Sequence, residues 1–316
     1  MQLIAGFDAG QTHTTCRLAL VDAHGAIQSL GEGQGSGVSH LAAAAGEARF
    51  QAALSSSLAA ARAAAPADWA NAPLATSAVG ASGMEAGSAV QARGVELAAR
   101  ALGLPAGAVA VTGDEHTALR GAFPQGEGIL LISGTGCICL GQNAQGAQHR
   151  CGGWGWLLDG AGSAMDIGRD GLALSVQMAD GRLPETALRA ALWTALGADT
   201  AQQVKARVVE RDFGAAGFAR LAPVLDQLAA AGDPHSQAVL QHSANALAGL
   251  VHGVAQHLAM DQPAVCGVGG ALRHLGQLRS RFAAALSQVL PGATRVEPQG
   301  DASHGALLLA ADLRQR

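Results

Sequence analysis

A short apolar run, a glycine-rich turn and a second apolar run follow one another between residues 128 and 140. Residues 129–132 are apolar, Ser133-Gly134-Thr135-Gly136 interrupt them, and the run resumes at 137–140. This pattern predicts two buried strands joined by a tight hairpin. The hairpin tip would present backbone N–H groups and two hydroxyls, which suits an anion such as a phosphate, although a plain hairpin turn explains the same residues.

The same arrangement occurs at the start of the chain. An apolar run at 2–8 ends in Asp8, a second run occupies 16–21, and the turn between them contains Gly10, Gln11 and Thr12. With a third strand expected at 26–31, this segment predicts an antiparallel meander and a second candidate phosphate-binding turn. Asp8 could approach a phosphate-bound Mg²⁺, usually through water, or could simply cap a plain hairpin.

Strands and helices alternate between the two hairpins. We expect a glycine-alternating loop at 31–39, then a helix at 40–65, a strand at 74–80, a helix at 88–102 and a strand at 108–112. Asp114 follows the last of these strands and has two interpretations. It is either the N-cap of the next helix or a carboxylate at the carboxyl end of a parallel strand, where open α/β sheets bind their ligands.

The second half repeats this order with a long helical insertion. Residues 165–260 are predicted to be mostly helical, and strands are expected at 264–268 and 294–297. Gly269-Gly270 ends the first of these strands, and helices are predicted at 271–289 and 303–313. No low-complexity linker separates the halves, so we expect an α/β protein whose two domains share a cleft.

Composition excludes several classes of protein. Only 14% of the 316 residues are charged and the net charge is −4, without a basic run, so we expect no nucleic-acid partner. No apolar window of about 18 residues and no signal peptide are present, which predicts a cytoplasmic protein without a membrane partner. The five cysteines indicate a reduced intracellular chain. Cys137, Cys139 and Cys151 are better explained as small buried hydrophobic residues than as metal ligands.

Several motifs in this order resemble one family. They are Asp8-x-Gly10-x-Thr12-x-Thr14, Thr112-Gly113-Asp114, Ile132-Ser133-Gly134-Thr135-Gly136, Cys151-Gly152-Gly153-Trp154-Gly155 and Val268-Gly269-Gly270, with Arg211-Asp212-Phe213, Ala216-Gly217-Phe218 and Gly232-Asp233-Pro234 in the helical region. Together they resemble the BadF/BadG/BcrA/BcrD-type ATPase family, which contains N-acetylglucosamine kinase, within the sugar-kinase, Hsp70 and actin superfamily. Each motif is weak alone, but the ordered set covers nearly the whole chain.

The resemblance implies two RNase-H-like domains with a nucleotide cleft between them, at 1–114 and 115–316, the last helix packing back on the first domain. It implies ATP and Mg²⁺ as cofactors, with Asp114 as the general base that deprotonates the 6-hydroxyl of a hexosamine and with Asp8 near the metal through water. The implied ATP-binding residues are Gly10, Gln11, Thr12, Ser133, Gly134, Thr135, Gly136, Gly269 and Gly270. A homodimer is expected from the resemblance alone.

Two segments depart from the family's sugar-contact pattern. Members usually have Gly-Asp-Glu-Gly-Ser, whereas this chain has Asp159-Gly160-Ala161-Gly162-Ser163, with the acid one position early. A sugar-binding Asn often follows the third strand, whereas this chain has Ser39 and His40 there. The substrate-binding candidates are Ser39, His40, Gly153 and Asp159, and the identity of the sugar, N-acetylglucosamine, glucosamine or another, stays open.

Two further functions fit the same fold. An ATPase activator of a dehydratase system needs cysteines that hold an iron–sulfur cluster at a dimer interface, and only Cys137, Cys139 and Cys151 are close in sequence. A non-catalytic regulator would bind nucleotide or sugar without phosphate transfer.

Overall fold

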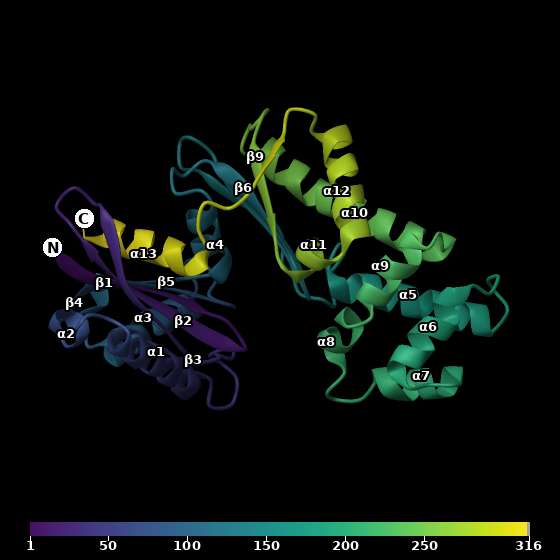
Figure 1. The fold of residues 1–316 in the computed structure, drawn as a ribbon, viewed down its shortest axis with the longest axis horizontal. Coiled ribbons are helices and arrows are strands. Elements are labelled where there is room, and N and C mark those ends of the chain that lie inside the picture. Colours follow the sequence, from purple (N-terminus) through teal and green to yellow (C-terminus); the bar gives the residue numbers. More distant parts are fainter. Residues whose placement is uncertain (315–316) are drawn as a thin grey trace. The chain divides into compact units, whose positions relative to one another are not determined.

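The computed structural model describes residues 1–314, which divide into two compact units (Figure 1). Unit 1 comprises residues 1–126 together with 297–316, and unit 2 comprises residues 127–296. The sequence placed a boundary at 114, where α4 (Asp114–Ala122) begins, but this helix packs against α13 (Ala302–Leu313) in unit 1. The division therefore follows α4, and the chain returns to unit 1 for its last helix.

Unit 1 contains a five-stranded sheet in the order β3-β2-β1-β4-β5. Its strands are β1 (Gln2–Ala9), β2 (His13–Val21), β3 (Ile27–Ser36), β4 (Leu74–Ala81) and β5 (Val109–Thr112). The first three strands are antiparallel, as the meander predicted, and β4 and β5 run parallel to β1. The carboxyl ends of β1, β4 and β5 consequently lie at the same edge of the sheet.

Unit 2 repeats this topology in a sheet of order β10-β9-β6-β7-β8. Its strands are β6 (Gly128–Ser133), β7 (Cys137–Gln142), β8 (Gln148–Gly152), β9 (Ala264–Val268) and β10 (Thr294–Val296). The β6–β7 hairpin is antiparallel and β9 is parallel to β6, so the hairpin corresponds to β1–β2 of unit 1. The predicted fold of two similar α/β units is confirmed, although strand β8 was missed.

Helices cover both faces of the sheet in unit 1 (Figure 1). The remaining ones are α1 (Gly46–Ala63), the single turn α2 (Ala67–Ala70), α3 (Ala89–Leu102) and the 3₁₀ turn η1 (Ala106–Ala108). Leu3, Ala5 and Phe7 of β1 pack toward α1 and α3, whereas Ile4 packs toward α13. This alternation follows from the two-residue period of a strand that is buried on both faces.

The glycine-alternating segment predicted as a loop is instead most of strand β3. Gly31, Gly33 and Gly35 share one face of the strand, and a Cβ on any of them would collide with α1. The two-residue spacing therefore records how closely α1 approaches the strand. Helix α1 also begins later than predicted, at Gly46, after a turn-containing segment at residues 37–45.

Unit 2 has its large core between the sheet and the predicted helical insertion. The helices are α5 (Ala164–Ala179), α6 (Ala187–Leu196), α7 (Ala201–Val208), α8 (Gly214–Ala219), α9 (Ala222–Ala230), α10 (Pro234–His257), α11 (Gly270–His274) and α12 (Gly276–Val289). Ile129, Leu131 and Val265 of the sheet pack against α5, α10 and α12. The helix predicted at 271–289 is thus interrupted between α11 and α12.

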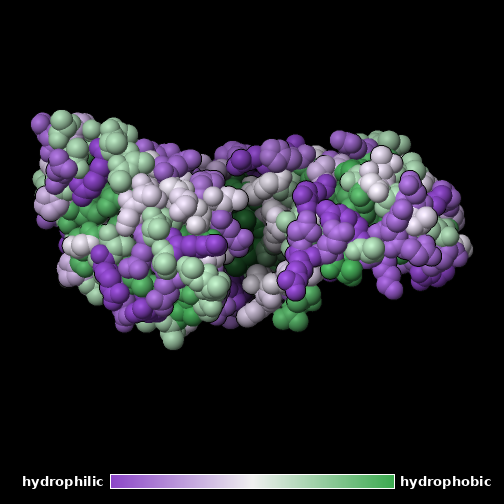
Figure 2. Space-filling view, turned by 90° about the horizontal axis from the view of Figure 1, so that it is seen from below, coloured by the Kyte–Doolittle hydropathy of each residue, from purple (hydrophilic) through white to green (hydrophobic). Residues whose placement is uncertain are grey.

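The surface shows no segregation into one polar and one apolar side in the view of Figure 2. The face seen in Figure 2 interleaves hydrophilic residues with scattered hydrophobic ones. Among the helices of residues 1–314, none is long and apolar enough to cross a membrane.

Helix α13 contacts both α4 and β1 through glycines. A Cβ at Gly305 would overlap the carbonyl oxygen of Thr117, one at Gly121 would overlap that of Asp301, and one at Gly6 would overlap the backbone of α13. Each of these contacts joins backbone to backbone, so no side-chain rearrangement could relieve the collision.

We therefore predict opposite effects for two helical Gly→Ala substitutions. Gly249→Ala in α10 meets no atom within 4 Å, so the helix propensity of alanine should stabilise the protein by about 0.5–1 kcal/mol. Gly305→Ala gains the same propensity but should destabilise it by about 3 kcal/mol through overpacking. Urea unfolding followed by circular dichroism measures both, and equal gains at the two positions would contradict the close packing of α13.

Candidate functional site

The first predicted phosphate-binding turn lies at the tip of the β1–β2 hairpin. Its Gln11 and Thr12 are exposed, and the N–H of Gly10 donates to the carbonyl of His13 at 3.1 Å. The segment after β3 supports the turn, because the N–H of Val38 donates to the carbonyl of Gly10 at 2.9 Å and a Cβ at Gly37 would collide with Gln11. The turn is therefore held in place by backbone contacts while its tip faces solvent.

Two carboxylates lie at the edge of the sheet beside this turn. Asp8 is aligned in register with Gly80 of β4, which is aligned with Thr112 of β5, and Asp114 starts α4 two residues later. Burial raises the pKa of Asp8 above its usual value, and the negative charges of Asp114 and Asp301 raise it further. The structure thus brings Asp8 and Asp114 together, as expected for groups that follow parallel strands.

Asp114 is the more strongly perturbed acid. Burial raises its pKa to about 6, and a hydrogen bond with Glu115 and the negative charge of that residue contribute. A helix N-terminus would by itself favour the charged form, so burial outweighs the helix dipole here. The N-cap of α4 is Gly113, without a side-chain capping bond, so the interpretation of Asp114 as an N-cap is wrong.

Asp301 is a third acid at this edge, and the sequence did not single it out. Its carboxylate caps α13 by accepting from the N–H of His304 and the hydroxyl of Ser303, both at 2.9 Å. Arg17 donates two hydrogen bonds to it at 2.8 and 2.7 Å and a third to Glu32 at 2.6 Å. Burial opposes these interactions, but together they lower the pKa of Asp301. The only sequence signal was an Asp before a helix, which also describes an ordinary cap.

The substrate-binding candidates Ser39 and His40 lie in unit 1, after β3. The hydroxyl of Ser39 is buried and has no hydrogen-bond partner within the described part of the chain. The Nδ1 atom of His40 accepts from the N–H of Ala42 at 3.2 Å, and its ring lies against Gly83 in the loop after β4. An unpartnered buried hydroxyl is costly unless a ligand or water satisfies it.

The other two substrate-binding candidates, Gly153 and Asp159, lie in unit 2 after β8. Gly152 and Gly153 both have φ of 75°, and a Cβ at Gly153 would come within 2.7 Å of the Ile138 side chain. Asp159 is half-buried near Gly152 and contributes to raising the pKa of Cys137 and Cys151. The two pairs of candidates therefore belong to different units.

The second predicted phosphate-binding turn, Ser133–Gly136, joins β6 to β7. The hydroxyl of buried Ser133 donates to the carbonyl of Gly162 at 2.8 Å. The N–H of Ala164, the first residue of α5, donates to the carbonyl of Gly134 at 2.8 Å. Gly269, with φ of 97°, packs so closely on Ser133 that a Cβ would overlap its carbonyl. The structure thus brings together the turn and the Gly269-Gly270 motif.

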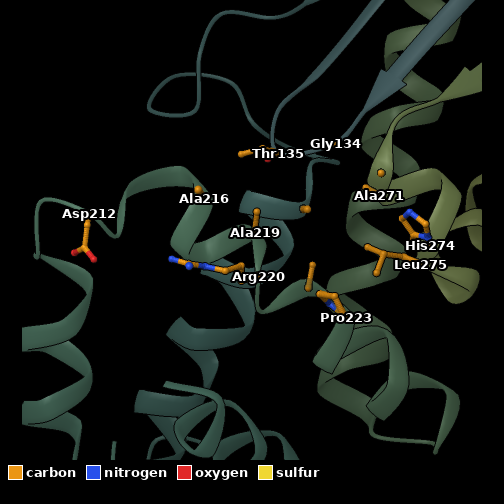
Figure 3. Close-up of a pocket in the computed structure, with 13 residues that line it drawn as sticks. Gly134, Thr135, Asp212, Ala216, Ala219, Arg220, Pro223, Ala271, His274 and Leu275 are labelled. Atoms are coloured by element: carbon orange, nitrogen blue, oxygen red, sulfur yellow. The ribbon is translucent and has the colours of Figure 1, made fainter. Parts of the chain in front are cut away.

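A cavity of about 510 Å³ opens beside this turn, within unit 2 (Figure 3). Its walls come from the turn, from α5, from the α7–α9 region and from α11. They are Gly134, Thr135, Ala164, Asp212, Ala216, Ala219, Arg220, Ala222, Pro223, Gly270, Ala271, His274 and Leu275. Ligand pockets typically have volumes of about 300–1,000 Å³. The sequence noted Asp212 and Ala216 only as family-like positions and did not assign this wall to the site.

Asp8 is the candidate ligand for magnesium. Among residues 1–314, no three His, Cys, Asp or Glu side chains converge as a metal site. Within the same residues, the Asp8 carboxylate forms no ion pair with a basic side chain. Mg²⁺ keeps several waters and is commonly held by one or two carboxylates plus substrate phosphates. Asp8 beside Asp114 fits that mode and does not fit a cage made entirely of protein ligands.

Two relatives resemble part of the chain. The N-acetylmuramic acid/N-acetylglucosamine kinase of Clostridium acetobutylicum is 28% identical over 206 residues, which are 65% of this chain and 67% of that protein. The N-acetyl-D-glucosamine kinase of Dictyostelium discoideum is 32% identical over 193 residues, which are 60% of each protein. The match thus spans about two thirds or less of each relative.

Solved structures extend the likeness to the whole fold. A provisionally named N-acetylglucosamine kinase from Chromobacterium violaceum is 27% identical and superposes with a TM-score of 0.74 over 98% of this chain and 99% of that one. A ROK-family glucokinase from Streptomyces griseus, at 18% identity and a TM-score of 0.57, shares the fold over 99% of this chain and 100% of that one.

The sequence pattern of one family covers almost the entire chain, from residue 5 to residue 310. The match includes both glycine-containing turns, Asp114 and the Gly269-Gly270 motif, which are among the segments from which the resemblance was inferred. This chain belongs to the BadF/BadG/BcrA/BcrD ATPase family.

Proposed function

We propose that this chain is an ATP-dependent amino-sugar kinase that phosphorylates the 6-hydroxyl of N-acetylglucosamine or glucosamine. The observation that carries the proposal is Asp114, a half-buried carboxyl group with a pKa of about 6 at the carboxyl edge of a sheet, beside Asp8. The two relatives named as N-acetylglucosamine kinases support the choice of sugar class.

Asp114 acts as the general base in this proposal. A base with a pKa near the working pH is ionised in much of the population and still binds the proton that it accepts. Its burial supplies that pKa, and the N–H of Glu115 donates to its Oδ1 atom at 3.1 Å, which helps to orient the carboxylate. Phosphoryl transfer otherwise depends mainly on positioning of the substrates and on stabilisation of the phosphate charge, so the proposal needs only one side chain that accepts a proton.

The two glycine turns bind the phosphates of ATP in this proposal. Gly10, Gln11 and Thr12 would offer backbone and hydroxyl groups from unit 1. In unit 2, Gly134, Thr135 and Gly136 would offer them, and Ser133, whose hydroxyl donates to Gly162, would support the turn. Asp8 would hold hydrated Mg²⁺, which neutralises phosphate charge when bound. The cavity beside Thr135 and Gly270 would receive the nucleoside part of ATP.

Sugar binding rests on four candidate residues in this proposal. The unpartnered hydroxyl of Ser39 would gain a hydrogen bond from a sugar hydroxyl, which would remove the cost of its burial. His40, Gly153 and Asp159 are the further candidates. Gly160 stands where the family usually has an acid, so Asp159 would have to replace that contact from the preceding position.

The activator function is disfavoured by the state of the thiols. Cys137 and Cys139 are buried, and burial raises the pKa of Cys137 to about 12 and that of Cys139 well above its usual value. Iron–sulfur clusters bind thiolates, so these residues would pay a large cost to serve as ligands.

The direct test is ADP release with a panel of sugars. We expect turnover with N-acetylglucosamine or glucosamine and none with the matching 6-deoxy sugar, because the attacking oxygen is then absent. N-acetylmuramic acid belongs in the panel because one relative is named for it. Tight binding of MgATP and sugar without any ADP release would favour a non-catalytic regulator.

Asp114→Asn should lower kcat by about 10²–10⁴-fold, the usual contribution of a general base. The KM for ATP should change little, because Asp114 is not among the residues proposed to bind ATP and does not line the cavity of unit 2. Asp68→Asn, at an exposed acid of α2, is the matched control and should have wild-type kinetics. Since burial disfavours the charged form of Asp114, the variant should melt at pH 8 no lower than wild type does. A variant that keeps its kcat would exclude Asp114 as the base.

The pH dependence of kcat/KM should report the pKa of Asp114. Activity is expected to fall as the pH drops through about 6, because protonated Asp114 cannot accept the substrate proton. Glu115→Gln removes a negative charge that raises this pKa, so the acid limb should shift to lower pH. The ionisation of MgATP is common to both proteins and cancels in the comparison. An acid limb that stays at the same pH or moves to higher pH in Glu115→Gln would show that the limb does not report the ionisation of Asp114.

A further inference from the structure

The wall formed by the α8–α9 region is the part of the nucleotide cavity that neither glycine motif explains. Ala216 and Ala219 lie in α8, Ala222 and Pro223 start α9, and Arg220 lies between the two helices. Short side chains leave room for a flat apolar group against this wall. An arginine between them is conspicuous, because it adds a long charged side chain to a surface otherwise kept small.

This wall is tied to the phosphate-binding turn through helix α5. The helix begins on the turn, where Ala164 donates to Gly134 at 2.8 Å. One turn further along, Gly168 packs so closely on α8 that a Cβ would overlap the carbonyl oxygen of Phe218. Since both contacts involve backbone, the position of the α8–α9 region relative to Gly134 and Thr135 is fixed before any ligand binds.

Arg220 carries a charge that the described part of the chain leaves unpaired. Among the described residues that line the cavity it is the one arginine or lysine, and it forms no ion pair within residues 1–314. Asp212, on the same wall, pairs with Arg207 and not with Arg220: its Oδ1 atom lies 3.6 Å from the Nη1 atom of Arg207. Figure 3 shows the Arg220 side chain extending from the α8–α9 junction toward the Asp212 side of the cavity, away from Leu275 and His274.

We propose that Arg220 is a nucleotide-binding residue whose guanidinium attracts the phosphates of ATP while the alanine and proline wall holds the nucleoside. The inference rests on the proposed kinase function. Arg220 and Thr135 both line this cavity of about 510 Å³. A nucleotide with its phosphates at Thr135 would therefore share one cavity with the Arg220 charge, and added salt would weaken their attraction.

Steady-state kinetics of two variants test the proposal. Arg220→Gln should raise the KM for ATP about tenfold, equivalent to about 1.4 kcal/mol, and leave kcat and the sugar KM nearly unchanged. Arg220→Lys keeps the charge but loses the planar donor group, so about a threefold rise is expected. Added salt should raise the KM of wild type more steeply than that of Arg220→Gln. Arg273→Gln, at an exposed arginine of α11 outside the cavity lining, is the matched control and should behave as wild type.

Calorimetry separates a failure of this inference from a failure of the kinase proposal. Arg220→Gln should weaken binding of MgADP about tenfold and leave binding of uncharged adenosine unchanged. That result supports the role of Arg220 even if no sugar is phosphorylated. Equal weakening of adenosine and MgADP would overturn the electrostatic role, because it would indicate a damaged wall. An unchanged MgADP affinity, or a wild type that binds no MgADP, would overturn it as well.

Discussion

Contact between backbones at glycine positions is the constraint on which both units depend. In unit 1, Gly33 lets α1 approach the edge strand β3, and Gly6 and Gly305 let α13 lie against β1 and α4. In unit 2, Gly168 of α5 allows close contact with α8, and Gly269, directly after β9, allows close contact with Ser133. Backbone contacts cannot relax by changing a rotamer, so they fix the positions of strand ends and turns more tightly than side-chain packing would.

That rigidity explains how the acids at the carboxyl edge of the sheet in unit 1 can stay close together. Asp8 and Asp114 are partly buried, and the negative charge of Asp114 raises the pKa of Asp8, a repulsion that would push flexible groups apart. Here β1 and α4 are held by Gly6, Gly80 and Gly121, so the carboxyls cannot separate without disturbing the helix contacts. The pKa of Asp114 is therefore set by the fold, and the same packing that stabilises the unit maintains a group poised to exchange a proton near neutral pH.

The sequence predicted the features that depend on local pattern. Both hairpins, the alternation of strands and helices, and Asp114 at the strand end followed from apolar runs and glycine turns. Features that depend on tertiary context were missed: the alternating glycines from Gly31 were assigned to a loop because their partner, α1, is not visible in the local pattern. Asp301 was missed because a capping Asp has the same local sequence whether or not Arg17 pairs with it. Strand β8 contains His149 and Arg150, and its pairing with β7 was not evident from its polar sequence.

The proposed phosphate-binding turns and the proposed sugar-binding residues differ in how clearly the sequence predicts them. Nucleotide phosphates are bound by backbone N–H groups in tight turns, which demand glycines at fixed spacing and so leave a pattern in the sequence. Sugar hydroxyls are recognised by side chains on loops, and several different residues can supply a donor or acceptor there. Ser39, His40 and Asp159 lie on such segments, so under the proposed function their departure from the family pattern would alter the sugar contacts and leave the turns unchanged. Arg220 lies between these two cases. Its backbone is held in place through the contact of Gly168 with α8, whereas the attraction proposed for its charge requires no fixed spacing to other residues and so gives no sequence motif.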